Sequence, residues 1–469
     1  MALTIEQHPL YNLNTVGQEV IFTASDATVV GTYFNVKYIA EVHIGSDTIN
    51  LATTTDLAGT FKTTPNNAAV GMYDFRPIIE SFVSADNLAP ITSEFKGVSY
   101  TNLPVHIIDK YSLNENSVRY LKIRFKIEGA ATAGGTVAPI VGAEEDSVQY
   151  TLINGYLKRT DVINLSANNF GYDTSRFYLH PLIVQGDVAG NWLSNAPTTQ
   201  YANISDYGNL AMYSADISSG TDLDKIVLTY FDKSGTQIGT EDIDNLDANG
   251  GFTTYGTTTN KQVMFFGCFP ANLRNWSSTF QALVTAGTIE GGYYTVRAVN
   301  SSTQTLLDII TINVNCPTLK GYEPIRLAWL NQWGVWDYYT FTMKSAKTTS
   351  TKGSTYQQIE GTWNDSLYQI NGFKGGKKAF RVNATEKIKM NTDFVNEAEA
   401  TWFEELINSP EVYILDGFQT DPTTPLLSTY VTPARLTTSS YTKKTVANDK
   451  LIQYEFEVEK SKTLRTQSV

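Results

Sequence analysis

Alternation of apolar and polar residues is the main signal along the chain, and it predicts mostly β-strands. Gln18–Ser25 and Gly31–Ile44 alternate with a period of two. This period is typical of strands with one buried face. Ser117–Glu128 is the clearest case, because every second residue from Ile123 onward is apolar. The small and flexible residues of Gly129–Val141 predict a long loop or a domain edge after this strand.

The middle of the chain predicts a β-hairpin. Lys225–Phe231 reads as a strand, residues 232–235 as a turn, and Thr236–Thr240 as the returning strand. Further strands are predicted at Lys261–Phe266, Gly292–Val299 and Thr305–Val314. Short strands separated by Gly and Asn turns favour β-sandwiches over α/β units.

The last third of the chain predicts one helix beside several strands. Apolar residues recur at three- and four-residue spacing over Asp393–Asn408, with Asn391 or Thr392 as the expected N-cap. Glu411–Leu415 and Leu451–Glu459 read as strands. This part is therefore predicted to be α+β.

The predicted fold class is mainly β, with two β-sandwich domains (Ig-like or jelly-roll-like) followed by an α+β domain. The predicted boundaries are residues 1–130 and 145–318 for the two β-sandwich domains and 319–469 for the α+β C-terminal module. A chain of 469 residues is too long for one ordinary core, which agrees with several domains.

Composition narrows the functional classes. Only 17% of the residues are charged, 42% are hydrophobic, and the net charge is −12. A negative field repels phosphate, so general coating of nucleic acid is disfavoured. The first residues lack the pattern of a secretory signal, and no run of 18 apolar residues occurs. We therefore expect no membrane partner and synthesis in a cytoplasm.

The sequence contains no recognisable catalytic, cofactor or metal motif. The histidines (His8, His43, His106 and His180) are scattered, and neither a Walker loop nor a G-x-S-x-G elbow occurs. Cys268 and Cys316 read as two buried or partly buried thiols, with a disulfide as the alternative. Asn371–Lys378 reads as a Gly-rich turn with solvated lysines. We expect no enzyme activity and no cofactor.

The densest aromatic stretch lies at residues 327–341. Large aromatics fill cores, and they are also enriched at protein interfaces. A third interpretation is a platform on which sugar rings stack. The interface candidates are Trp329, Trp333, Trp336 and Tyr338.

The last third of the chain resembles a module of virion structural proteins in tailed bacteriophages, particularly crAss-like phages. The residues that carry the resemblance are Trp329-Leu330-Asn331, Gly334-Val335-Trp336-Asp337, Asn391-Thr392-Asp393-Phe394, Trp402, Glu405-Leu406, Ser409-Pro410-Glu411-Val412-Tyr413 and Asn448-Asp449-Lys450-Leu451. Tyr73-Asp74-Phe75-Arg76-Pro77 is also similar. The likeness covers about 150 residues well, and it carries no catalytic residue.

This resemblance implies a structural subunit of the tail, the baseplate or the ring assembly below the portal. The implied partners are copies of the same chain in a ring and other virion tail or portal-adaptor proteins. DNA would pass through a lumen without specific binding, and the localisation would be the virion, assembled in the host cytoplasm. The alternatives are a receptor- or carbohydrate-binding adhesin on the virion and an extracellular hydrolase with two facing carboxylates.

Overall fold

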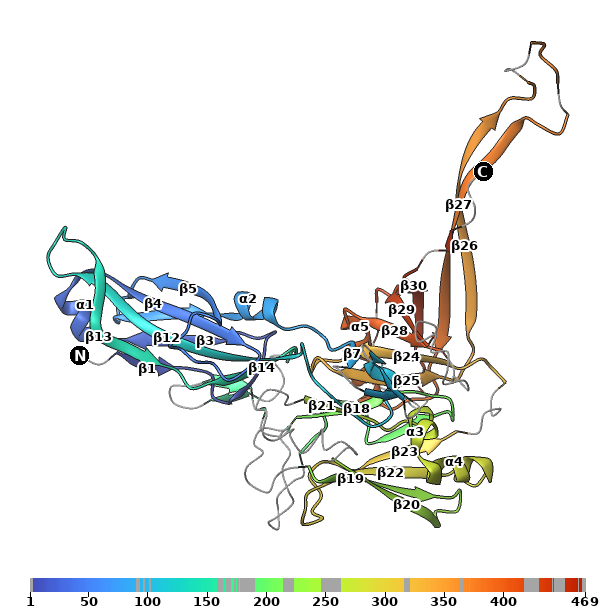
Figure 1. Cartoon of the computed structure of the whole chain (residues 1–469), viewed down its shortest axis with the longest axis horizontal. Helices are drawn as coiled ribbons and strands as arrows, with labels where there is room; N and C mark the ends of the chain where they lie inside the picture. Colours follow the sequence, from blue (N-terminus) through green and yellow to red (C-terminus); the bar gives the residue numbers. More distant parts are fainter. Residues whose placement is uncertain are drawn as a thin grey trace. The chain divides into compact units, whose positions relative to one another are not determined.

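The chain is mainly β and forms several sheets (Figure 1). This computed structural model describes residues 3–89, 93–95, 98–100, 103–157, 163–165, 170–172, 174, 177, 190–213, 223–245, 263–315, 321–362, 366–370, 372–416, 430–440, 442, 452–462 and 464–465. The contacts divide the chain into two units. Unit 1 holds residues 1–317, 330–337 and 418–425, and unit 2 holds residues 318–329, 338–417 and 426–469.

Two sheets in the first part of unit 1 share one hydrophobic core. One has the strand order β2-β14-β12-β4-β5, with β13 also paired to β12, and the other has the order β1-β3-β6. Phe22 lies at the centre of this core and contacts Phe125 at 6.0 Å and Tyr150 at 5.6 Å between ring centroids. The strands are β1 (Thr4–Gln7), β2 (Leu13–Thr15), β3 (Ile21–Ser25), β4 (Phe34–Gly45), β5 (Leu57–Thr63), β6 (Val70–Asp74), β12 (Val118–Ala130), β13 (Ala138–Asp146) and β14 (Tyr150–Ile153).

The alternation predicted for Ser117–Glu128 is confirmed in β12. Leu121, Ile123, Phe125 and Ile127 are buried in the core, and the residues between them are half-buried on the other face. The predicted loop at Gly129–Val141 is wrong in part, because β13 begins at Ala138 and pairs antiparallel with β12. Most residues of β13 face water, so the strand has no apolar alternation that the sequence could show.

The second part of unit 1 contains a five-stranded and a three-stranded sheet. Their orders are β17-β23-β22-β19-β20 and β11-β21-β18. The predicted hairpin is confirmed, because β19 pairs antiparallel with β20. The elements are β11 (Tyr111–Leu113), β17 (Thr199–Ala202), β18 (Asn209–Tyr213), β19 (Lys225–Phe231), β20 (Gln237–Asp244), β21 (Val263–Gly267), α3 (Pro270–Trp276), α4 (Ser278–Thr285), β22 (Tyr293–Val299) and β23 (Ile310–Val314). The two helices were not predicted, and Ser277 caps α4 by accepting from the Phe280 N–H at 2.9 Å.

Short elements connect these sheets. Two-stranded pairs are formed by β7 with β10, β8 with β9, and β15 with β16. Their bounds, with the short helices, are α1 (Ala27–Thr32), α2 (Arg76–Ile79), η1 (Glu80–Phe82), β7 (Leu88–Ala89), β8 (Ser93–Phe95), β9 (Val98–Tyr100), β10 (Leu103–Pro104), η2 (Val105–Ile107), β15 (Ile163–Leu165) and β16 (Phe170–Tyr172). Cys268 is buried directly after β21, and Cys316 lies outside the described residues.

Unit 2 is one eight-stranded sheet with a helix. The order is β25-β24-β28-β29-β30-β27-β26, with β31 also paired to β27. The elements are β24 (Ile325–Leu330), β25 (Trp336–Phe341), β26 (Ala346–Gln358), β27 (Gly376–Asn391), α5 (Glu397–Asn408), β28 (Val412–Leu415), β29 (Val431–Leu436), β30 (Glu455–Lys460) and β31 (Leu464–Arg465). Phe403 of α5 packs on Tyr339 and Phe456, at 4.9 and 5.6 Å between ring centroids.

The helix α5 begins later than predicted. Asn396, not Asn391 or Thr392, is its N-cap, and it forms a capping box with Glu399. The Asn396 carboxamide oxygen accepts from the Glu399 N–H at 2.9 Å, and the Glu399 carboxylate accepts from the Asn396 N–H at 2.7 Å. These reciprocal bonds satisfy two backbone donors that a helix start leaves unpaired. Asn391 instead ends β27.

His43 of β4 is a buried histidine with an unusual environment. It is 2% exposed, and neither ring nitrogen has a hydrogen-bond partner among the described residues. Burial lowers the pKa of His43, although the carboxylates of Glu41, Asp56 and Asp146 oppose this shift and Arg124 adds to it. The neutral imidazole is therefore favoured in the folded state.

We predict that His43 weakens the folded state in mild acid. Below pH about 6.5 the unfolded chain binds a proton at this residue more readily than the folded chain does, because the folded pKa is lowered, so stability falls as the pH falls. Between pH 7.5 and pH 5.5, the melting temperature should fall less for His43→Leu than for the unchanged chain. Carboxylates titrate equally in both proteins, so identical losses would contradict the prediction.

Candidate functional site

The four interface candidates of the aromatic stretch are buried. Trp329, Trp333, Trp336 and Tyr338 are between 0 and 4% exposed. In unit 2, Trp329 packs on Trp402 at 4.9 Å between ring centroids, and the Arg326 guanidinium lies 5.3 Å from the centre of the Tyr338 ring. Such buried rings offer little surface to a partner.

The turn between β24 and β25, residues 330–337, belongs to unit 1. The Asn331 carboxamide oxygen accepts from the Trp333 N–H at 2.9 Å, and its NH₂ group donates to the Asp337 carboxylate at 3.0 Å. The Trp336 indole N–H donates to the Asp86 carbonyl at 2.9 Å. Gly334 has a φ of +74°, and a Cβ placed there would lie 1.4 Å from the Asn154 carbonyl oxygen. Only glycine fits this position.

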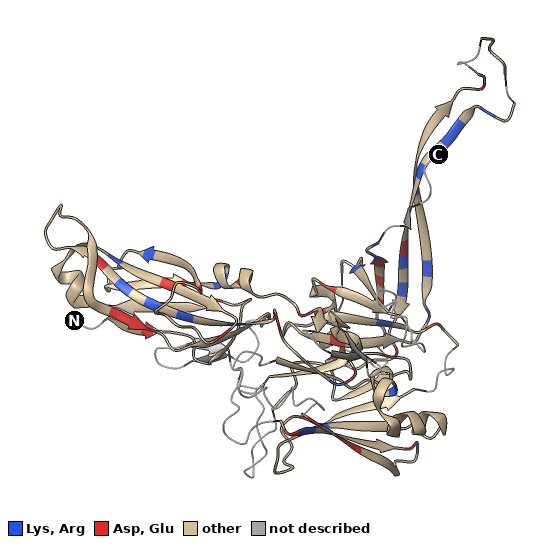
Figure 2. Ribbon diagram, in the orientation of Figure 1, with Lys and Arg blue, Asp and Glu red and all other residues tan. Residues whose placement is uncertain are grey.

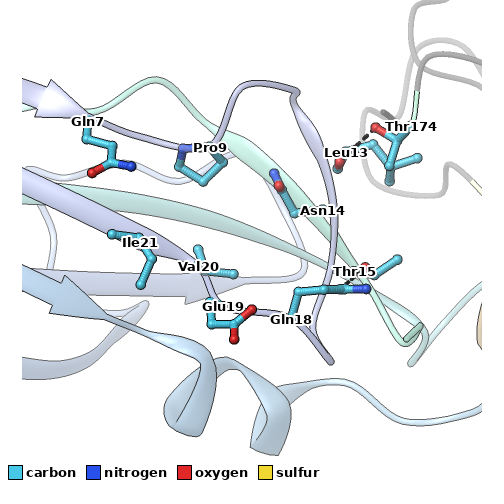
Figure 3. A pocket seen from close by; sticks show the side chains of 10 residues that line it. All are labelled: Gln7, Pro9, Leu13, Asn14, Thr15, Gln18, Glu19, Val20, Ile21 and Thr174. Carbon is cyan, nitrogen blue, oxygen red and sulfur yellow. Dashed lines mark hydrogen bonds between the residues drawn. The ribbon is translucent and has the colours of Figure 1, made fainter. Parts of the chain in front are cut away.

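A small pocket in unit 1 does not provide a ligand site (Figure 3). It has room for about one water molecule. Glu19 is the one ionisable side chain in its lining. The buried NH₂ group of Gln18 has no hydrogen-bond partner among the described residues, and a water in the pocket would satisfy it.

Clusters of metal ligands and membrane-spanning helices are absent from the described residues. In the part of the chain that the structure describes, no three His, Cys, Asp or Glu side chains cluster as metal ligands would. No helix of that part combines the length and the apolar character that crossing a membrane requires.

An exposed β-hairpin is the most distinctive surface of the molecule. It consists of β26, β27 and the residues between them, and we call residues 346–391 the arm (Figure 1). All 13 residues of β26 pair antiparallel with β27. At about 3.3 Å per residue, the ladder is about 40 Å long. Ten of these 13 residues are exposed in an unbroken run from Ala346 to Thr355, so the ladder has almost no core beneath it.

The composition of the arm explains how it forms strands without a core. β26 is rich in Thr, whose branched Cβ favours extended backbone. The strand pairing shifts by one residue between Ser354 and Thr355. Such a bulge increases the local twist of a two-stranded ribbon. Isolated hairpins are marginally stable in water, so the arm depends on its attachment.

The base of the arm is anchored in the sheet of unit 2. Ile388 and Met390 of β27 are buried, and residues 387–391 pair with β30. Ion pairs add to this attachment, from Lys387 to Glu457 at 2.9 Å, Lys389 to Glu455 at 2.7 Å and Lys460 to Glu386 at 3.1 Å. All three pairs are at least partly exposed to solvent, which screens their charges, so each adds little stability. The buried apolar residues hold the base, and the ion pairs reinforce it.

The far end of the arm, residues 359–381, is the arm tip, and it exposes many apolar side chains. Phe373 is 80% exposed and Ile370 is 73% exposed. The exposed large apolar residues of the tip are Ile359, Leu367, Tyr368, Ile370, Phe373 and Phe380. Single exposed apolar residues are normal on protein surfaces, but six on one end of a hairpin are typical of surfaces that contact a partner.

The arm tip is also basic. Its cationic residues are Lys374, Lys377, Lys378 and Arg381, against the two acidic residues Glu360 and Asp365. None of these four cations forms an ion pair with a described residue, in contrast to the lysines at the base. Figure 2 shows this concentration of basic residues on β27. The prediction of a Gly-rich turn at Asn371–Lys378 is wrong in part, because β27 begins at Gly376 and holds Lys377 and Lys378. The prediction that its lysines are solvated is confirmed, because Lys374, Lys377 and Lys378 are all exposed. The whole chain has a net charge of −12, so the positive charge of the arm tip is a local feature.

The sequence predicted the lysines of this tip but not its role. The interface prediction rested on the dense aromatic residues at 327–341, and the fold buries the four candidates among them. The apolar residues of the tip are spread over a turn rather than gathered in one run, so they gave no pattern. Comparison of the chain with protein-family models and with curated proteins finds no match.

We predict that Gly334→Ala strongly destabilises the protein. A left-handed residue costs alanine about 1–2 kcal/mol, and the contact with Asn154 adds a clash to this cost. Gly287→Ala is the matched control, because Gly287 has a φ of +67° with no atom near its Cβ position. Chemical denaturation should show that Gly334→Ala lowers the free energy of unfolding much more than Gly287→Ala does. Equal losses would mean that the turn moves to accommodate the methyl group.

We also predict that residues 353–382, which we call the outer arm, can be removed without loss of stability. Replacing residues 353–382 by Asn-Gly joins Lys352 to Asn383, which face each other in the ladder. The described strand residues of the deleted segment bury almost no apolar surface, so the melting temperature should change by less than about 2 °C. Differential scanning calorimetry measures this. A fall of more than about 5 °C would show that the outer arm supports the fold.

Proposed function

We propose that this protein is a structural subunit of a larger assembly, in which the arm makes the principal contact between subunits. The observation that carries the proposal is the exposed, apolar and basic arm tip on a ladder with almost no core of its own. A chain gains no folding stability from such an element. Its apolar side chains become favourable only when a partner covers them.

The assembly that we propose is a bacteriophage virion, at the tail, the baseplate or the ring below the portal. The resemblance of residues 329–451 to virion proteins of tailed phages supports this, and the mainly β fold is consistent with it. The proposal includes two β-sandwich domains before the α+β module, no catalytic activity, and virion localisation. The partners would be copies of the chain and neighbouring tail or portal-adaptor proteins, with DNA passing through any lumen without specific binding.

A specific observation also favours the alternative of a receptor- or carbohydrate-binding adhesin. The arm tip exposes Tyr368, Phe373 and Phe380, and aromatic faces of this kind can stack on sugar rings. An adhesin would bind a glycan or receptor as a single chain, whereas a structural subunit binds its neighbours. Binding to a glycan array that is lost on truncation of the arm, without self-association, would favour the adhesin.

We predict that the apolar residues of the arm tip drive association. Ile370→Ser with Phe373→Ser should raise the concentration at half-association by about 30-fold or more, because two such residues contribute at least about 2 kcal/mol when buried. Sedimentation velocity over a range of concentrations measures this. Met72→Ser with Tyr201→Ser is the control, since both residues are more than half exposed and lie outside the arm.

Two outcomes would contradict the proposal. The first is a chain that stays monomeric at every concentration and also in a crowding polymer that favours association. The second is association that the control pair weakens as much as the tip pair does.

A further inference from the structure

The strand β13 provides a surface that complements the arm tip. We call residues 137–148 the β13 edge. Glu144, Glu145 and Asp146 make it acidic, and it contains no basic residue. It also exposes apolar side chains, with Val141 97% exposed and Val148 60% exposed. Figure 2 shows the acidic residues gathered on β13.

The β13 edge is open to a partner. Among the described pairings, β13 pairs only with β12, so its other side is a free strand edge. The Arg124 guanidinium donates two hydrogen bonds to the Asp146 carboxylate, from Nε at 2.7 Å and from Nη2 at 2.9 Å. Glu144 and Glu145 form no ion pair with any described residue, and both are exposed. Two carboxylates are therefore available beside exposed valines.

A protective role is the simpler explanation of these charges. Acidic residues and irregular pairing discourage strand edges from joining one another, and Gly142 interrupts this strand with a φ of +81°. Val141 argues against protection alone. Val137 and Val148 of the same edge are exposed as well, and protective charges do not explain several exposed apolar side chains on one strand edge.

We propose that the arm tip of one copy docks on the β13 edge of a second copy. This inference rests on the proposed function and names the partner surface. Lys374, Lys377 and Lys378 supply positive charges that can form ion pairs with the two glutamates of the edge. Phe373 and Ile370 supply apolar area that can cover the exposed valines. Charge complementarity orients the contact, and burial of the apolar residues stabilises it.

The contact joins two different surfaces of the same chain. Such a head-to-tail contact leaves one free arm tip and one free β13 edge on every pair of copies. Further copies add at both ends until a ring closes or a filament grows. A symmetric dimer, in which the same surface meets itself, would not use this pair of surfaces.

The test uses charge-reversed variants of the full chain. The arm variant carries Lys374→Glu and Lys377→Glu, and the edge variant carries Glu144→Lys and Glu145→Lys. In each variant alone, like charges face each other, so association should weaken at least tenfold. An equimolar mixture should associate again, because each acidic arm tip finds a basic β13 edge and each basic arm tip finds an acidic one. Sedimentation velocity measures the variants and the mixture.

The control variant carries Lys233→Glu and Lys462→Glu, which change the net charge as the arm variant does. Both residues are exposed and have no ion pair with a described residue. The control should associate like the unchanged chain. Calorimetry of every variant should show an unchanged melting temperature, because none of the reversed residues is buried.

Each other result has a distinct meaning. If the arm variant loses association but the mixture does not regain it, the arm docks on another surface and this inference fails while the proposed function stands. If the unchanged chain never associates, both fail. If the unchanged chain binds vesicles of phosphatidylglycerol and the arm variant does not, with no association between chains, the tip recognises an anionic lipid surface and the inference is overturned.

Discussion

The anchoring of β27 in the sheet of unit 2 is the interaction on which the arm depends. Strands normally derive their stability from a buried face, and most of the arm has none. The arm can exist only because β27 continues into a wider sheet, where Ile388 and Met390 are buried. The same strand therefore has two environments. One end is a core strand, and the other carries an exposed apolar surface that a partner can cover.

The distribution of charge follows the same division. Lys387 and Lys389 of β27 are paired with glutamates of β30, and Lys460 of β30 is paired with Glu386 of β27. The lysines of the tip form no ion pair with a described residue. A chain with a net charge of −12 repels its copies at long range. In the docking that we propose, the local basic tip sets the orientation in which two copies approach. Its specificity comes from the position of a few charges, and its stability comes from apolar contact.

Sequence patterns predicted those parts of the fold that bury one face. The alternation around Ile123 and Phe125 identified β12, and the apolar stripe that includes Phe403 identified α5. The start of α5 was misplaced because Asn391, Thr392 and Asn396 all have capping side chains, and only the reciprocal bond with Glu399 selects Asn396. β26 has water on both faces, so it has no apolar period, and the arm could not be predicted.

The anchoring of the arm also has a consequence for biosynthesis. Lys387 and Asn391 of β27 pair with β30, whose residues follow more than sixty positions later in the chain. A ribosome releases the two partners at different times, so the first strand waits for the second. An incomplete chain has only a loose hairpin at this place. The arm is thus held at its base only in chains whose β30 has been made, so unfinished chains would not present the proposed contact surface in a fixed direction.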